Sequence, residues 1–79
     1  MVRRWEYRTP QGVFRIVRES EDPHCEILFE DEPLGHASYS AEALELLIGG
    51  HTTWPSAGDP KNMGLPKTLA EWTFVDEGL

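Results

Sequence analysis

The stretch SAEALELLIGG, residues 40–50, has the composition and the ending of one short helix. Six of the eight residues in 41–48 are Ala, Leu or Ile, and only Glu42 and Glu45 are polar. Ser40 is placed as an N-cap, and Gly49 or Gly50 as the left-handed residue that ends a helix. We therefore predict a helix over residues 41–48 whose apolar arc is too wide to be covered from one side only.

The chain before this helix has the pattern of an antiparallel meander. Residues 3–8, 13–19 and 24–30 alternate in polarity and are rich in β-favouring side chains. They are separated by TPQG and SEDP, which are turn sequences. After a turn at DEPLG, residues 35–39 are expected to add a short fourth strand. We therefore predict a sheet of three to four strands.

The loops predict which residues lie opposite one another. A four-residue loop over residues 9–12, with its glycine left-handed, places Tyr7 opposite Phe14. The same rule applied to residues 20–23 pairs Phe14 with Phe29. A three-residue first loop with a bulge is the alternative, but it mixes polar and apolar side chains on each face. The apolar face then carries Trp5, Tyr7, Phe14, Ile16, Ile27 and Phe29.

The opposite face of the predicted sheet is mostly charged, with aliphatic side chains between the charges. Arginine and aliphatic groups interleaved with acids are typical of a polar protein–protein interface or a homodimer patch, and an ordinary solvated face is the alternative. The residues that would form such an interaction surface are Arg4, Arg8, Arg15, Val17 and Leu28.

The same three arginines, Arg4, Arg8 and Arg15, are the best argument for nucleic-acid binding. The predicted register, however, places Glu6 across from Arg15 and between the other two, so that the charges largely cancel. Weak nucleic-acid binding through this face is therefore less favoured than protein or small-molecule binding.

The C-terminal part of the chain supplies the apolar residues that could cover the second side of the helix. Leu65, Leu69 and Trp72 recur at helical spacing after Pro66, which predicts one helical turn, and WTFV alternates as a short last strand would. The residues available as cover are Trp54, Met63, Leu65, Leu69, Trp72 and Phe74. We predict one α+β domain, residues 1–79, in which a Trp-rich C-terminal segment covers the helix.

The connection GGHTTWPSAG, residues 49–58, is a candidate ligand-binding loop. His51, Thr53 and Trp54 combine an aromatic wall with polar groups, as small-molecule pockets do, and such a site could have an accessory enzymatic function. The alternative is structural: Thr52 and Thr53 satisfy loop backbone groups while Trp54 anchors the loop to the helix. The sequence leaves both open.

Cysteine and histidine do not suggest a catalytic or metal centre. Cys25 is the only cysteine, so neither an internal disulfide nor a zinc site with two or four cysteines can form within the chain. In the predicted register Cys25 lies on the apolar face, where a thiol behaves as a small hydrophobe. The histidines, His24, His36 and His51, lie on three different predicted elements. We therefore predict no catalytic residue, no metal and no cofactor.

The net charge of −7 is unevenly distributed along the chain. Residues 1–18 hold five Arg and one Glu, whereas residues 19–79 hold two Lys and thirteen acids. Such an acidic chain is repelled by phosphate backbones and anionic membranes. The N-terminus lacks the apolar run of a secretory signal, and the aliphatic runs are too short for a membrane span. These features predict a cytoplasmic protein.

The motifs of the chain follow one another in an order that is similar to a known class of proteins. A Trp5-x-Tyr7 strand opening a meander, a short helix closed by Gly49-Gly50, then HTTWPS and LAEWTFV, resemble small bacterial proteins classed as domains of unknown function. The resemblance implies a bacterial cytoplasmic protein of similar fold, and it implies no activity. We therefore expect a small non-catalytic module that binds a protein partner or a second copy of itself, with small-molecule binding as the alternative.

Overall fold

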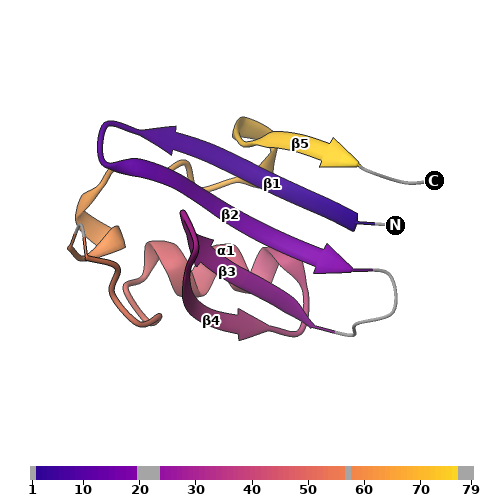
Figure 1. Ribbon diagram of the computed structural model, residues 1–79, viewed down its shortest axis with the longest axis horizontal. Coiled ribbons are helices and arrows are strands. Elements are labelled where there is room, and N and C mark those ends of the chain that lie inside the picture. The colour runs from indigo at the N-terminus through magenta and orange to yellow at the C-terminus, as the bar shows by residue number, and fades with distance from the viewer. Residues whose placement is uncertain (1, 20–23, 57, 77–79) are drawn as a thin grey trace.

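The chain forms a five-stranded antiparallel sheet with one α-helix on one of its faces (Figure 1). The computed structural model describes residues 2–19, 24–56 and 58–76. The elements are β1 (Val2–Thr9), β2 (Gly12–Glu19), β3 (Cys25–Phe29), β4 (Glu32–Ala37), α1 (Ser40–Ile48), two 3₁₀ turns η1 (Pro60–Asn62) and η2 (Leu69–Glu71), and β5 (Thr73–Asp76). The strand order is β4-β3-β2-β1-β5. The predicted α+β meander is confirmed, and the WTFV segment adds the fifth strand at the edge.

The predicted register of the first three strands is confirmed. Tyr7 lies opposite Phe14, and Phe14 lies opposite Phe29. The rings of Phe14 and Phe29 are 4.8 Å apart between centroids. Because side chains alternate between the faces of a strand, this single register places the six residues of the predicted apolar face on the same side.

The first hairpin turns more tightly than predicted. Thr9 and Gly12 are themselves paired, which leaves only Pro10 and Gln11 between the strands. The Thr9 hydroxyl donates to the Gly12 carbonyl at 2.9 Å and accepts from the Gln11 and Gly12 amides, each at 3.2 Å. Gly12 has the positive φ that the prediction required, at 154°.

The fourth strand differs from the prediction of residues 35–39. It begins at Glu32, and the turn before it contains Glu30 in the left-handed region at φ 53°. A bulge then interrupts the pairing, because Ile27 pairs with Gly35 while Leu28 pairs with Pro33. The bulge leaves Leu34 as an extra residue, and the Leu34 side chain is buried in the core. The predicted loop at residues 20–23 lies outside the described residues.

The ends of α1 confirm the predicted stop and correct the predicted start. The N-cap is Tyr39, so the prediction of Ser40 at that position is wrong, and the Glu42 carboxylate accepts from the Ser38 amide at 2.9 Å. At the other end Gly50 has φ 73° and donates its amide to Leu47 O, while the His51 amide donates to the carbonyl of Leu46. This pair of hydrogen bonds is a Schellman motif.

The hydrophobic core lies between the sheet and α1. The helix buries Ala43, Leu44 and Leu47 against strands β2, β3 and β4. Leu46 and Ile48 are partly buried and also pack against the core. The buried apolar residues are Phe14, Ile16, Cys25, Ile27, Phe29, Leu34, Ala37, Ala43, Leu44, Leu47, Leu65 and Trp72.

Two of the predicted C-terminal residues, Leu65 and Trp72, belong to this core. The Trp72 ring packs 5.7 Å from the ring of Tyr7 on β1. The predicted helical turn over residues 65–72 shrinks to η2, and the Trp72 indole instead donates to the Pro66 carbonyl at 3.3 Å. Trp54 does not pack as predicted, because the residue is 58% exposed.

Two glycines with the same φ angle provide a test of this packing. Gly12 and Gly35 both have φ 154°, but a Cβ at Gly12 would lie 2.6 Å from Phe29 Cζ, whereas a Cβ at Gly35 would meet nothing within 4 Å. We expect Gly12→Ala to lose about 1–3 kcal/mol more unfolding free energy than Gly35→Ala, because the buried Phe29 ring has little room to move. Urea denaturation measures the difference, and equal losses would contradict the close packing of Phe29 on Gly12.

The docking of α1 gives a second prediction. Truncating the buried Leu44 to Ala should lower the free energy of unfolding by about 2–4 kcal/mol, because it leaves a cavity beneath the helix. The matched control is Glu45→Ala at the exposed neighbouring position, which should change stability by about 0.5 kcal/mol or less. Similar thermal midpoints for the two variants would mean that another face of α1 meets the sheet.

Candidate functional site

The loop after α1 is tied to the edge strand β4. The Thr53 amide donates to the Leu34 carbonyl at 2.9 Å. The Ser56 hydroxyl donates to one Glu32 oxygen at 2.7 Å, and the Ser56 amide donates to the other at 3.3 Å. These bonds hold the loop at both ends of its central Trp54-Pro55 pair.

Trp54 projects from this loop while its neighbour Pro55 is buried. The indole Nε1 donates to the Gly50 carbonyl at 3.4 Å, which links the ring to the end of α1. A large aromatic side chain is therefore presented to solvent from a loop that is hydrogen-bonded on both sides. The Trp54 ring therefore contributes little to the core of the molecule.

His51, Thr53 and Trp54, the residues of the predicted ligand site, do not line any of the hollows found among the described residues. His51 and Thr53 are exposed, and the Thr52 hydroxyl is buried without a hydrogen-bond partner among the described residues. The loop is thus held by backbone amides and by Ser56 rather than by the threonine hydroxyls, contrary to the prediction for Thr52 and Thr53. The predicted link between Trp54 and the helix is present as the indole bond to Gly50. Three hollows on the described part of the surface are lined by other residues.

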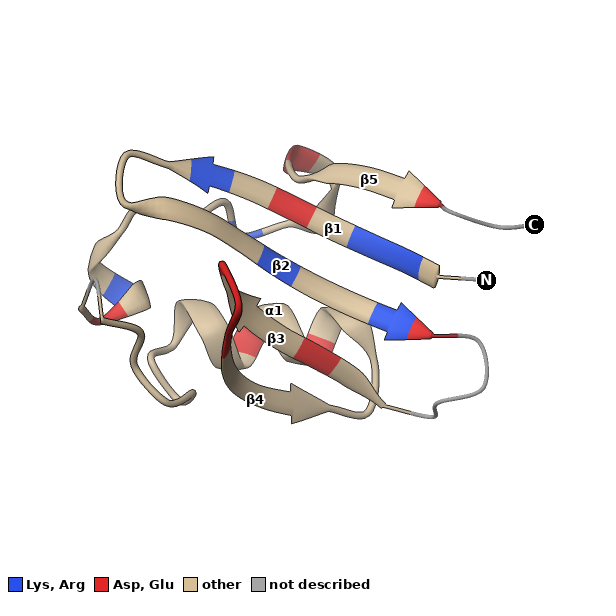
Figure 2. Ribbon diagram, in the orientation of Figure 1, with Lys and Arg blue, Asp and Glu red and all other residues tan. Residues whose placement is uncertain are grey.

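The face of the sheet opposite α1 carries the predicted lattice of charges. Glu6 forms an ion pair with Arg4 at 3.1 Å and another with Arg15 at 2.9 Å. A second nitrogen of Arg15 donates to the Glu30 carbonyl at 3.1 Å. In Figure 2 an acidic segment of β1 lies between two basic segments of the same strand. Glu6 therefore offsets part of the positive charge that the arginines bring to this face.

The remaining residues of the predicted interaction surface lie around this lattice. Arg8 is exposed, whereas Val17 and Leu28 are half-buried between charged neighbours. A hollow of about 350 Å³ adjoins Arg8 where β5 meets β1, and it is also lined by Glu6, Tyr7, Glu71 and Thr73. The structure thus places all five predicted surface residues on the sheet face opposite α1, with Arg8 at one end.

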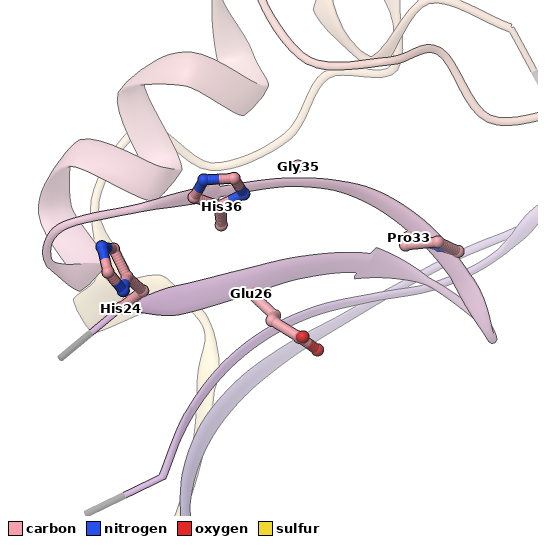
Figure 3. A pocket seen from close by; sticks show the side chains of 5 residues that line it. All are labelled: His24, Glu26, Pro33, Gly35 and His36. Carbon is pink, nitrogen blue, oxygen red and sulfur yellow. The ribbon is translucent and has the colours of Figure 1, made fainter. Parts of the chain in front are cut away.

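A hollow that the sequence did not predict lies over β3 and β4 (Figure 3). It has a volume of about 350 Å³ and is lined by His24, Glu26, Pro33, Gly35 and His36. The imidazole rings of His24 and His36 are 5.8 Å apart between centroids and meet edge to face at 85°. An adjoining hollow of about 110 Å³ shares His24 and Glu26 and adds Val17 and Glu19.

Strand pairing explains how these side chains come together. Glu26 lies directly opposite His36, and His24 lies two residues before Glu26, so all three project from the same face of the sheet. The sequence contains the His24-x-Glu26 alternation, but the position of His36 depends on the β3–β4 register and its bulge. The three histidines lie on separate elements, as predicted. The sequence did not reveal that the elements carrying His24 and His36 are neighbours in the sheet.

The described residues also bear on the cysteine, on preformed metal sites and on membrane-spanning helices. Cys25 is buried in the core, as predicted. Among the described residues, no three His, Cys, Asp or Glu side chains are already arranged to hold a metal ion. No described helix has the length and apolarity that crossing a membrane requires.

Comparisons with known proteins add nothing to this geometry. A scan against protein-family models, a search of curated proteins and a search of solved structures each found no match. The resemblance to small bacterial proteins stays a prediction.

The ion pair between Glu6 and Arg15 makes a testable contribution to stability. We expect a double-mutant cycle between Glu6→Ala and Arg15→Ala to yield a coupling of about 0.2–1 kcal/mol, because both side chains are partly solvated. The coupling should shrink in 1 M NaCl, where the Debye length is about 3 Å. Urea denaturation of the four proteins at both salt concentrations measures it. Zero coupling at low salt would mean that the ion pair does not form in solution.

Proposed function

We propose that the protein is a non-catalytic interaction module that binds a partner protein through Trp54. The observation that carries the proposal is the exposure of Trp54, 58%, in a loop that hydrogen bonds hold at both ends. Tryptophan is among the residues that contribute most to protein–protein binding when they enter a pocket on the partner. The partner would therefore present an apolar pocket.

The order of the loop supports this role. The bonds from Thr53 to Leu34 and from Ser56 to Glu32 restrain the backbone on either side of Trp54. A side chain restrained in this way loses less conformational entropy on binding than one on a free loop. More of the energy from burying the indole is then available for affinity.

The charge of the chain indicates the kind of partner. Glu32 lies at the base of the Trp54 loop, and Asp59 lies beside Gly50, whose carbonyl accepts from the indole. Lys61 lies in the same neighbourhood, but the chain as a whole carries −7. A pocket with a basic rim complements this surface and speeds association.

The rest of the C-terminal segment has a structural role in this proposal. The burial of Leu65 and Trp72 in the core supports the idea that this segment covers apolar surface. The short turn η1 also packs against α1. Trp54 contributes no such cover. We infer that the segment completes the core while leaving Trp54 for the partner.

The outer sheet face is a second candidate for contact, through self-association. Val17 and Leu28 offer partly exposed apolar area there, but Arg4 and Arg15 are already paired with Glu6. If a second copy of the chain bound here and separated those ion pairs, their interaction energy would be lost and the affinity would fall. We therefore assign this face a lesser part than Trp54.

The test compares two exposed aromatic residues. Tyr39 is 54% exposed at the other end of α1 and serves as the matched control for Trp54. We expect a binding protein recovered from the source cell to bind Trp54→Ala roughly 30-fold more weakly than the wild type, as loss of a binding hot spot implies, and to bind Tyr39→Ala normally. Titration of the purified pair measures the affinities after circular dichroism has shown that both variants are folded.

Two results would count against this function. A partner that binds both variants as well as the wild type would show that Trp54 is not the contact. A wild-type dimer in light scattering that Trp54→Ala converts to a monomer would show that the indole binds a second copy of the chain rather than a different protein.

A further inference from the structure

We propose that the hollow over β3 and β4 is a binding site for a divalent transition-metal ion such as Zn²⁺, with His24 and His36 as ligands and Glu26 as the third. This site lies apart from the Trp54 loop in the chain and does not depend on the proposed interaction function. It also goes against the sequence-based prediction of no metal, because only the paired strands bring the two imidazoles together.

The distance between the two rings suits a shared ion. Zinc lies about 2.0–2.1 Å from an imidazole nitrogen, so the centres of two rings on one tetrahedral ion are roughly 5 Å apart. The centroids of His24 and His36 are 5.8 Å apart. Both side chains are exposed, so small changes in their torsion angles would bring one nitrogen of each ring to the same ion.

Glu26 is placed to complete the site. Its position directly opposite His36 and two residues after His24 puts the three side chains at the corners of a triangle on one face. Figure 3 shows the Glu26 carboxylate turned away from the two rings. Since Glu26 is exposed, rotation of its side chain towards the ion needs no movement of the strand.

The chemistry of the ligands selects the class of metal. Two imidazoles and one carboxylate suit Zn²⁺, Ni²⁺ or Cu²⁺, whereas Ca²⁺ and Mg²⁺ require a shell of oxygen atoms. The hollow of about 350 Å³ leaves room for water to fill the remaining positions. Glu19 lines the adjoining hollow with His24 and Glu26, and its negative charge favours a cation there.

The state of the side chains also predicts the strength of binding. The described residues hold no three ligating groups already gathered around a point, so the ion has to draw Glu26 inwards. Reorganisation of this kind weakens affinity relative to a preformed site. We therefore expect reversible binding that a strong chelator removes without unfolding the protein, in contrast to a structural zinc site.

The experiment is calorimetric titration of the untagged full chain with ZnCl₂, repeated with NiCl₂. We expect one saturable site per chain. His24→Gln and His36→Gln should each lower the affinity at least tenfold, and Glu26→Gln should lower it several-fold. The matched control is His51→Gln, because His51 is exposed on the loop after α1 and should leave the affinity unchanged.

A second measurement locates the ion independently of affinity. In proton–nitrogen correlation spectra, substoichiometric Ni²⁺ should broaden the amide signals of β3 and β4 before those of β5. The proposal is overturned by absence of saturable binding, by binding that His51→Gln removes, or by binding that survives both His24→Gln and His36→Gln. Unchanged affinity in Glu26→Gln would overturn the three-ligand form of the site.

Discussion

A mismatch in width between one helix and five strands governs this structure. A helix with its side chains is about 10 Å across, whereas five strands spaced about 4.8 Å apart span roughly 19 Å. The nine residues of α1 pack mainly on β2, β3 and β4. The apolar face of β1 therefore needs other cover, and the C-terminal segment provides it. Trp72 packs against Tyr7, and Phe74 on β5 packs against Trp5 with ring centroids 5.2 Å apart.

The need to cover the apolar face of β1 also decides which C-terminal residues enter the core and which stay exposed. Leu65 and Trp72 are used in the core, and β5 extends the sheet by pairing with β1. Trp54 is excluded because the loop that carries it is bonded to β4, at the opposite edge of the sheet from β5. An ordered, exposed indole is the result, and the proposed interaction function rests on it.

The face of the sheet turned away from α1 follows a different rule. No helix among the described residues covers it, and Glu6 forms ion pairs there with Arg4 on its own strand and with Arg15 on the neighbouring strand. At the β3–β4 end the pairing instead places two imidazoles beside Glu26. The two proposed binding regions thus arise where side chains are not required by the core.

The amino-acid sequence alone determined the local patterns: the alternation that pairs Tyr7 with Phe14, and the Gly50 ending of α1. These could be predicted because each depends on residues close in the chain. The bulge at Leu34, the burial of Trp72 rather than Trp54, and the meeting of His24 with His36 were decided only in the tertiary structure. Each depends on which distant segments compete for the same apolar surface or the same strand edge, and residue spacing carries no information about that competition.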